Sequence, residues 1–253
     1  MFDTLNFFKK PQTSKLGDKL DQLSKLYLNS PSSEKIKKAI EFADSAHQGQ
    51  YRKSGEPFLM HPINVGLILA SLKMDADTII AGLLHDVVED CEIPISKVKK
   101  EFGKNVSVLV NGVTKLPQLD EKIKGDSQAE NFQKMALATA EDVRVVIIKL
   151  ADRLHNLKTI EHLPREKQIK KSRETLDLYA PLAHQIGMHK MAVELEDISF
   201  KTIHPIRHQM IEDALKKNDL SRDHLISRVK KAVRKKFSDA RIEVKITGRE
   251  KRI

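Results

Sequence analysis

Histidine and acidic side chains gather at the end of an apolar run in the segment LLHDVVED, residues 83–90. On a helix, positions four apart share a face, which pairs His85 with Glu89. By the same rule Asp86 pairs with Asp90. Carboxylates this close raise one another's pKa unless a cation neutralises them. Because imidazole nitrogen and carboxylate oxygen both bind metals, the segment indicates a metal site, with an exposed acidic helix end as the alternative.

Two further segments carry residues of the same kind. His61 stands just before a proline in FLMHPINV, where a capping or core histidine is the alternative reading. Asp152 follows the buried run of IIKLADRLHN, where an ion pair with Lys149 or Arg153 is the alternative. Taken in chain order with the His-Asp pair of LLHDVVED, these segments supply two histidines and two aspartates that can meet around one ion.

Helices must position these residues, because apolar side chains recur at helical spacing along most of the chain. Serines precede the first clear helix, at 30–49, and are suited to cap it. Glycines and prolines make 47–62 a loop, and the polar segment 117–128 is the best candidate for a mobile connection. The run VRVVII resembles a buried strand, but its continuation favours a helix. The expected helical segments are 62–74, 76–90, 94–116 broken near Gly103, 129–163 broken near Glu141 and Asp142, and 165–200 broken at Gly187.

The pattern of apolar and charged residues changes near residue 204. Residues 221–237 form a basic amphipathic pattern, and 240–248 alternate with Ile242, Val244 and Ile246 on one face, as in a strand. A lone strand is not stable by itself, so we expect the start of a second domain here. Residues 207–253 hold 15 Lys and Arg against 7 Asp and Glu, which favours a solvated charged helix over a nucleic-acid patch.

The composition sets broad limits on the class of protein. Of 253 residues, 40% are hydrophobic and 32% are charged, which suits a soluble globular chain. There is no apolar run of about 18 residues and no pattern of a signal peptide, so we expect neither a membrane helix nor secretion. The single cysteine, Cys91, excludes an internal disulfide and fits a reducing compartment, so we expect a cytoplasmic protein.

Several strings resemble the hydrolase domain of the RelA/SpoT family, which belongs to the HD superfamily of metal-dependent phosphohydrolases. They are HQGQYRKSGEPFLMHP, AGLLHDVVED, VTKL, IIKLADRLHNLKT and YAPLAHQIGM, and KITGREKRI resembles the opening of that family's synthetase domain. The resemblance implies an all-α fold. It implies an N-terminal extension at 1–30, an HD-domain helical bundle at 31–204, and a linker helix with an incomplete synthetase start, a short α+β fragment, at 205–253.

The resemblance also implies a reaction and its residues. The reaction is Mn²⁺-dependent removal of the 3′ pyrophosphate from guanosine tetraphosphate or pentaphosphate. The implied metal ligands are His61, His85, Asp86 and Asp152. The implied catalytic acidic pair is Glu89 and Asp90. The implied nucleotide-binding residues are Arg52 and Lys53 beside the guanine base, and Asn156 and Thr159 in the pocket.

Two other functions are open. One is a broader nucleotide phosphohydrolase on the same scaffold. The other is a non-catalytic module that binds alarmone or ribosome, for which the intact acidic pair is unfavourable. We expect no synthetase activity from this chain, and ribosome association only through regions beyond it. Gln133 stands where the family usually has a basic residue, and the sequence predicts no effect for it.

Overall fold

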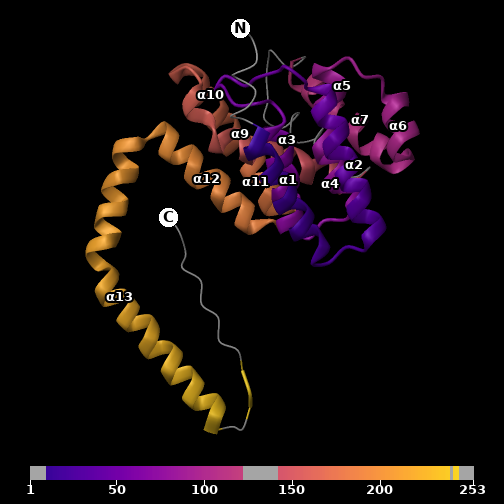
Figure 1. Ribbon diagram of the computed structural model, residues 1–253. Helices are drawn as coiled ribbons and strands as arrows, with labels where there is room; N and C mark the ends of the chain where they lie inside the picture. Colours follow the sequence, from indigo (N-terminus) through magenta and orange to yellow (C-terminus); the bar gives the residue numbers. More distant parts are fainter. Residues whose placement is uncertain (1–9, 122–141, 240–241, 245–253) are drawn as a thin grey trace. The chain divides into compact units, whose positions relative to one another are not determined.

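The computed structural model describes residues 10–121, 142–239 and 242–244, and it is all-α (Figure 1). Its first helices are α1 (Lys10–Lys25), α2 (Ser30–Ala46), α3 (Met60–Ser71), α4 (Ala76–Leu84), α5 (Val87–Asp90), α6 (Ile95–Phe102) and α7 (Lys104–Glu121). The later ones are α9 (Val143–Lys158), the 3-10 turn η1 (Ile160–His162), α10 (Arg165–Glu174), the π-helix η2 (Thr175–Tyr179), α11 (Ala180–Gln185), α12 (His189–Ile203) and α13 (Pro205–Asp239). None of the described helices is long and apolar enough to cross a membrane.

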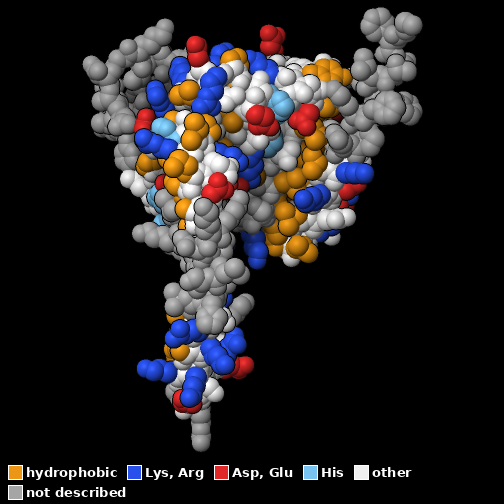
Figure 2. Space-filling view, turned by 90° about the vertical axis from the view of Figure 1, so that its left-hand side faces the viewer, with side chains coloured by type: hydrophobic (Ala, Val, Ile, Leu, Met, Phe, Trp, Pro, Cys, Tyr) orange, Lys and Arg blue, Asp and Glu red, His pale blue; other side chains and the backbone are white. Residues whose placement is uncertain are grey.

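The chain divides into two compact units, residues 1–199 and 200–253. The second unit consists, in its described part, of the end of α12, helix α13 and residues 242–244. Lys and Arg side chains gather along the described C-terminal part of α13 (Figure 2), while Ile226, Val229 and Phe237 are exposed on the same helix. The basic amphipathic helix expected at 221–237 is therefore confirmed as a helix.

Helices α3, α4 and α9 form the centre of the first unit (Figure 1). The N-terminal helix α1 packs on α3, α2 packs on α4, and α7 packs on α4 and α9. Their contact faces are fully buried, for example at Ile63, Leu83 and Ile148. Burial of each such side chain contributes about 1.5–3 kcal/mol. Where α7 approaches α9, a Cβ on Gly112 would lie 2.8 Å from a methyl group of Val145, so glycine permits this close packing.

The ambiguous run VRVVII lies in α9 and is helical, as favoured. Ten residues of α9 are buried, including Val145, Ile148 and Ala151, so the helix has apolar neighbours on several sides. A helix buried all round lacks the polar stripe that marks an amphipathic helix, which explains the strand-like pattern. The helix expected before residue 142, and Glu141 itself, lie outside the described residues. Helix α9 begins after Asp142, whose carboxylate caps it by accepting a hydrogen bond from the backbone N–H of Arg144.

The other expected breaks are confirmed at Gly103 and Gly187, which adopt φ values of 96° and 79°. The cap expected from the serines of α2 is wrong in its residue. The side chain of Asn29 caps the helix by accepting from the backbone N–H of Ser32 at 3.1 Å. Asparagine satisfies this N–H as well as serine does, and it stands one position outside the helix, where a cap must be.

The single helix expected over 76–90 is wrong, because it is interrupted at His85 and Asp86 between α4 and α5. The Nδ1–H of His85 donates to the backbone carbonyl oxygen of Gly82 at 2.8 Å. A continuous helix would offer that oxygen to the backbone N–H of Asp86. The side chain therefore competes with the helix ladder at this point.

Two other expectations meet the structure only in part. Residues 117–121, expected in a mobile connection, belong to α7, whereas 122–128 and Gln133 lie outside the described residues. Of the expected strand at 240–248 the structure describes 242–244 and assigns no strand to them, so the α+β fragment is not supported. A strand needs a partner for its backbone groups, and within the described residues the sole β-bridge joins Tyr51 and Pro57.

Candidate metal centre and nucleotide cavity

The two histidines and two aspartates predicted as metal ligands lie together in the first unit. His61 comes from the first turn of α3, His85 and Asp86 from the break after α4, and Asp152 from the middle of α9. Ligand atoms of His61, His85 and Asp86 all lie within 4.8 Å of one another. Oδ1 of Asp152 lies 3.2 Å from Nε2 of His61 and 3.7 Å from Nε2 of His85.

These separations match those of ligands that share one ion. Two atoms each about 2.1 Å from a metal stand about 3.0 Å apart at a right angle and about 3.4 Å apart at the tetrahedral angle. The two Nε2 atoms of His61 and His85 are 3.4 Å apart. The carboxylate of Asp86 lies 3.0 Å from Nε2 of His85 and 3.6 Å from Nε2 of His61. The cluster therefore has the dimensions of a divalent-cation site.

His85 is oriented toward the cluster by its hydrogen bond to Gly82, which fixes a proton on Nδ1 and turns Nε2 inward. Burial alone would lower the pKa of this ring, but the carboxylates of Asp86 and Asp152 raise it to about 9. The protonated ring thus offsets part of the negative charge of these carboxylates. A bound metal would displace that proton, as ligand imidazoles must be neutral.

The carboxylate of Asp152 contacts both the histidines and Lys149, so the ion pair expected with Lys149 is confirmed, while its role as a metal ligand stays a prediction. Its Oδ1 faces the histidines, whereas its Oδ2 lies 3.2 Å from Nζ of Lys149, one turn earlier on α9. Burial favours the neutral acid, but the Lys149 ammonium and the two histidines hold the pKa of Asp152 well below its usual value. The other suggested ion-pair partner, Arg153, instead contacts Glu174 at 2.9 Å.

Glu89 and Asp90, the predicted catalytic pair, lie on the single turn of α5 directly after the cluster, and both are exposed. The surrounding protein removes part of their water and raises the pKa of each. The nearby Asp86 carboxylate raises both pKa values further. Carboxylates with raised pKa values occur both at catalytic sites and in structural ion clusters, so the catalytic role of this pair stays a prediction.

A cavity of about 350 Å³ brings together all four predicted nucleotide-binding residues, Arg52, Lys53, Asn156 and Thr159. The sequence reasoning missed its other lining residues, which are Tyr51, Ser54, Phe58, His162, Leu163 and Lys171. Phe58 lies in the loop string that carries His61, so its place could have been noticed. Lys171 belongs to an exposed basic run on α10, and no sequence pattern separates it from solvated lysines.

The cavity and the cluster share a hydrogen-bonded connection. Nη2 of Arg52 donates to Oδ1 of Asn156 at 2.6 Å, and Nδ2 of Asn156 donates to Oδ1 of Asp152 at 2.6 Å. The expected face of α9 at i and i+4 is thereby confirmed for Asp152 and Asn156. Arg52 is half-buried, and its loop is closed by a 2.9 Å hydrogen bond from its backbone N–H to the carbonyl of Glu56.

His155 is a buried residue of this region that the sequence reasoning did not identify. Its Nδ1 lies 2.8 Å from Nδ1 of His61 and 3.3 Å from Nη1 of Arg52. Burial, assisted by His61 and the Arg52 cation, lowers the pKa of His155 to about 3, so the ring is neutral. On sequence alone a lone histidine inside a buried helix looks like a core residue.

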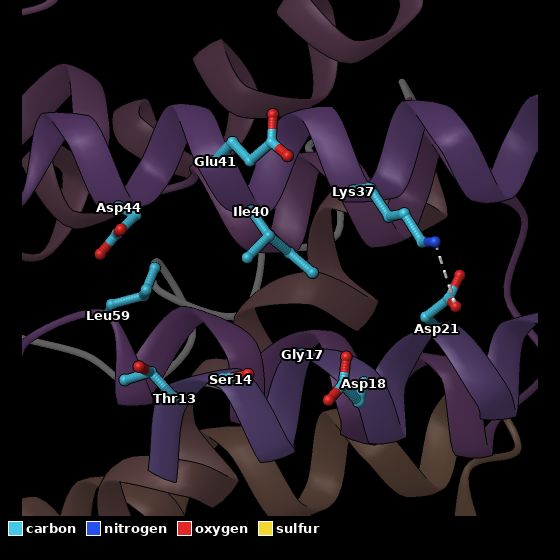
Figure 3. A pocket seen from close by; sticks show the side chains of 10 residues that line it. All are labelled: Thr13, Ser14, Gly17, Asp18, Asp21, Lys37, Ile40, Glu41, Asp44 and Leu59. Atoms are coloured by element: carbon cyan, nitrogen blue, oxygen red, sulfur yellow. Dashed lines mark ion pairs between the residues drawn. The ribbon is translucent and has the colours of Figure 1, made fainter. Parts of the chain in front are cut away.

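A second, larger hollow of about 430 Å³ lies between α1 and α2 (Figure 3). It contains none of the predicted site residues. Its acidic side chains are Asp18, Asp21, Glu41 and Asp44. Among the described residues that line it, Lys37 is the single cation, and it forms an ion pair with Asp21. An anionic hollow repels polyphosphates, so the cavity at Arg52 suits a nucleotide better despite its smaller volume.

Comparison with known proteins finds relatives whose names describe enzymes of guanosine polyphosphates. SpoT of Escherichia coli K12, named as a bifunctional (p)ppGpp synthase/hydrolase, is 40% identical over 94% of this chain and 34% of its own length. The guanosine-3′,5′-bis(diphosphate) 3′-pyrophosphohydrolase of Vibrio cholerae is 39% identical over 94% of this chain and 34% of its own. A GTP pyrophosphokinase of Streptomyces coelicolor is 46% identical over 85% of this chain and 25% of its own. The chain thus spans about a third or less of these relatives.

Among solved structures, one described as a metazoan SpoT ortholog that hydrolyses ppGpp is 26% identical, with a TM-score of 0.49 over 71% of this chain and 97% of that one. The family assignment is independent of that likeness. Residues 39–189, more than half of the chain, match the sequence profile described as HD domain. This protein therefore belongs to the HD domain family.

Proposed function

We propose that this chain is a Mn²⁺-dependent (p)ppGpp 3′-pyrophosphohydrolase, which converts guanosine tetraphosphate or pentaphosphate to GDP or GTP and pyrophosphate. The observation that carries the proposal is the connection Arg52–Asn156–Asp152, which joins a cationic cavity to a cluster with metal-site dimensions. A hydrolase of a nucleotide polyphosphate needs these two features side by side. The Vibrio cholerae relative is named for this reaction, and the Escherichia coli K12 relative is named as a (p)ppGpp synthase/hydrolase.

Four residues of this chain would hold the cation: His61, His85, Asp86 and Asp152. Two imidazole nitrogens and two carboxylate oxygens fit Mn²⁺, which prefers oxygen ligands and also accepts imidazole. When bound, the cation polarises a phosphoryl oxygen and lowers the pKa of water. The inward Nε2 of His85, fixed by Gly82, and the 3.0–3.7 Å separations support this assignment.

The cavity would bind the nucleoside part of the substrate. Arg52 offers a planar cation suited to stacking on a base, and the half-buried ring of Phe58 lines the same space. Lys53 and Lys171 are exposed cations at its wall that would attract phosphates. The volume of about 350 Å³ lies within the range of small-molecule sites.

Glu89 and Asp90 would activate the attacking water. Hydrolysis joins the water oxygen to phosphorus, breaks the bond to the ribose 3′ oxygen, and leaves that oxygen with a proton. A carboxylate with a raised pKa takes the water proton more readily than an ordinary one does. The directions of both pKa shifts and the place of α5 beside the cluster support this general-base role.

Incubation with guanosine tetraphosphate, with and without Mn²⁺, tests the proposal through analysis of the products. We expect GDP and pyrophosphate, formed only with the cation. Equal turnover of ordinary nucleotides would instead favour the broader phosphohydrolase. Binding of guanosine tetraphosphate without any product would favour a non-catalytic module, and Glu89→Gln serves as the matched inactive control.

We also propose three further properties from the family resemblance. They are an HD domain bounded at residues 31–204, a cytoplasmic location, and ribosome association only through regions beyond this chain. Cell fractionation and ribosome co-sedimentation are the corresponding tests.

A further inference from the structure

The ring of His61 makes contacts on both of its nitrogens. Nε2 faces the aspartates of the cluster, whereas Nδ1 lies 2.8 Å from Nδ1 of His155. Two ring nitrogens at this distance form a hydrogen bond only if one carries a proton and the other does not. The short contact therefore fixes opposite states on the two facing nitrogens.

The direction of this hydrogen bond follows from the neighbours, if the cluster binds a cation as in the proposed function. A metal takes the lone pair of His61 Nε2, so the proton of that ring must be on Nδ1 and must be donated to His155. Nη1 of Arg52 lies 3.3 Å from the same Nδ1 of His155. Guanidinium nitrogens are donors only, so this cation also favours an unprotonated Nδ1 on His155.

The same neighbours show what would happen without His155. Nη1 of Arg52 also lies 3.4 Å from Nδ1 of His61. With no acceptor at position 155, Arg52 would donate to His61 and favour the tautomer with its proton on Nε2. That proton would occupy the position from which His61 contacts the cation.

We propose that His155 is a positioning residue that holds His61 in the tautomer whose Nε2 lone pair faces the cation. His155 does this by accepting the Nδ1–H of His61 and by keeping Arg52 from donating to that nitrogen. Arg52, on the wall of the nucleotide cavity, is thereby kept from donating to His61 of the metal centre, although the two side chains lie within hydrogen-bond distance. The inference rests on the proposed function for the presence of a cation at His61.

Two substitutions separate the acceptor from the ring. His155→Phe keeps an aromatic ring in the buried site but removes the acceptor, whereas His155→Asn loses the ring but offers an amide oxygen near the position of Nδ1. His184→Phe is the matched control, because His184 contacts Glu196 on α12 and lines neither the cavity nor the cluster. Melting temperatures and circular dichroism verify that each variant is folded.

Calorimetric titration with Mn²⁺ and nitrogen-15 spectra of the histidine rings measure the effect. We expect His155→Phe to bind Mn²⁺ about 10- to 100-fold more weakly, as for other residues that orient metal ligands, with His155→Asn recovering most of the loss. In proteins loaded with diamagnetic Zn²⁺ in place of Mn²⁺, the spectra should show a hydrogen-bonded Nδ1–H on His61 in the parent and in His184→Phe. In His155→Phe the signal of this proton should shift or broaden, because its acceptor is gone.

The outcomes distinguish this inference from the proposed function. If His155→Phe is folded, binds Mn²⁺ as tightly as the parent and keeps the parent's His61 Nδ1–H signal, the positioning role is refuted while the metal centre stands. If His155→Phe and His155→Asn lose affinity equally, the acceptor role is refuted. If the parent itself binds no Mn²⁺, the proposed metal centre fails and the inference fails with it.

Discussion

The bridge formed by Asn156 can be removed without a change of shape by the substitution Asn156→Leu. The parent side chain accepts from Nη2 of Arg52 and donates to Oδ1 of Asp152, both at 2.6 Å. Each is a hydrogen bond to a charged group, and such bonds contribute about 1.5–3 kcal/mol. Since a factor of ten corresponds to about 1.4 kcal/mol, loss of the Arg52 bond alone should lower kcat/KM roughly 10- to 100-fold.

A double-mutant cycle with Arg52→Ala isolates this contribution. If Arg52 acts in catalysis only while Asn156 holds it, Arg52→Ala should lower kcat/KM much less in the Asn156→Leu variant than in the parent. We expect a coupling free energy of about 1.5–3 kcal/mol between Arg52 and Asn156. The assay is kcat/KM for guanosine tetraphosphate at saturating Mn²⁺, together with the calorimetric affinity for GDP.

Asn105→Leu is the matched control, because the Asn105 side chain donates to Asp77 at the surface, away from the cavity residues. It should leave kcat/KM unchanged. Effects of Arg52→Ala and Asn156→Leu that add within about 0.3–0.5 kcal/mol would refute the bridge, because independent sites behave in that way.

Three further predictions concern catalysis, packing and pH. Glu89→Gln should lower kcat about 10²- to 10⁴-fold, which is the usual contribution of a general base, while the Mn²⁺ affinity stays within a few-fold of the parent. Normal turnover by this variant would exclude Glu89 as the general base. Gly112→Ala should lower the melting temperature, because its methyl group would meet the stiff side chain of Val145. Gly17→Ala should instead raise stability by about 0.8–1 kcal/mol, because its methyl group would make only an ordinary contact with Ile40 at 3.9 Å. Effects of equal sign would contradict the packing. The contacts of Asp142 with Arg144 lower the pKa of Asp142. They therefore stabilise the fold above the unfolded-state pKa, and this stability is lost as the pH falls through the folded-state pKa. Asp142→Asn should make the melting temperature fall less steeply at acid pH, and an unchanged fall would assign the loss to other carboxylates.

Much of the candidate site could be anticipated because its chemistry is written in residue types and in their order. Histidine and aspartate at the ends of buried runs are unusual enough to suggest a cation, and helices place those ends in the core. The contacts of Asp152 show the limit of this reasoning. From the sequence, an ion pair with Lys149 and a place beside the histidines are alternatives, but the structure contains both contacts.

The features that were missed depend on contacts between distant residues or on single hydrogen bonds. The break at His85 follows from one side-chain bond to the Gly82 carbonyl, which helix propensity does not encode. The place of His155 between His61 and Arg52 depends on the packing of α9 against α3 and the loop before it. Alternation of Ile242 and Val244 predicted a strand, but alternation alone does not supply a neighbouring strand.

The central claim is that His61, His85, Asp86 and Asp152 hold one divalent cation. A crystal of the chain soaked in Mn²⁺, with anomalous diffraction recorded at the manganese edge, tests it most directly. We expect a single strong peak about 2.0–2.3 Å from Nε2 of both histidines and from a carboxylate oxygen of each aspartate. A peak at another site, or one that contacts the histidines while Asp152 turns away to Lys149 alone, would contradict it.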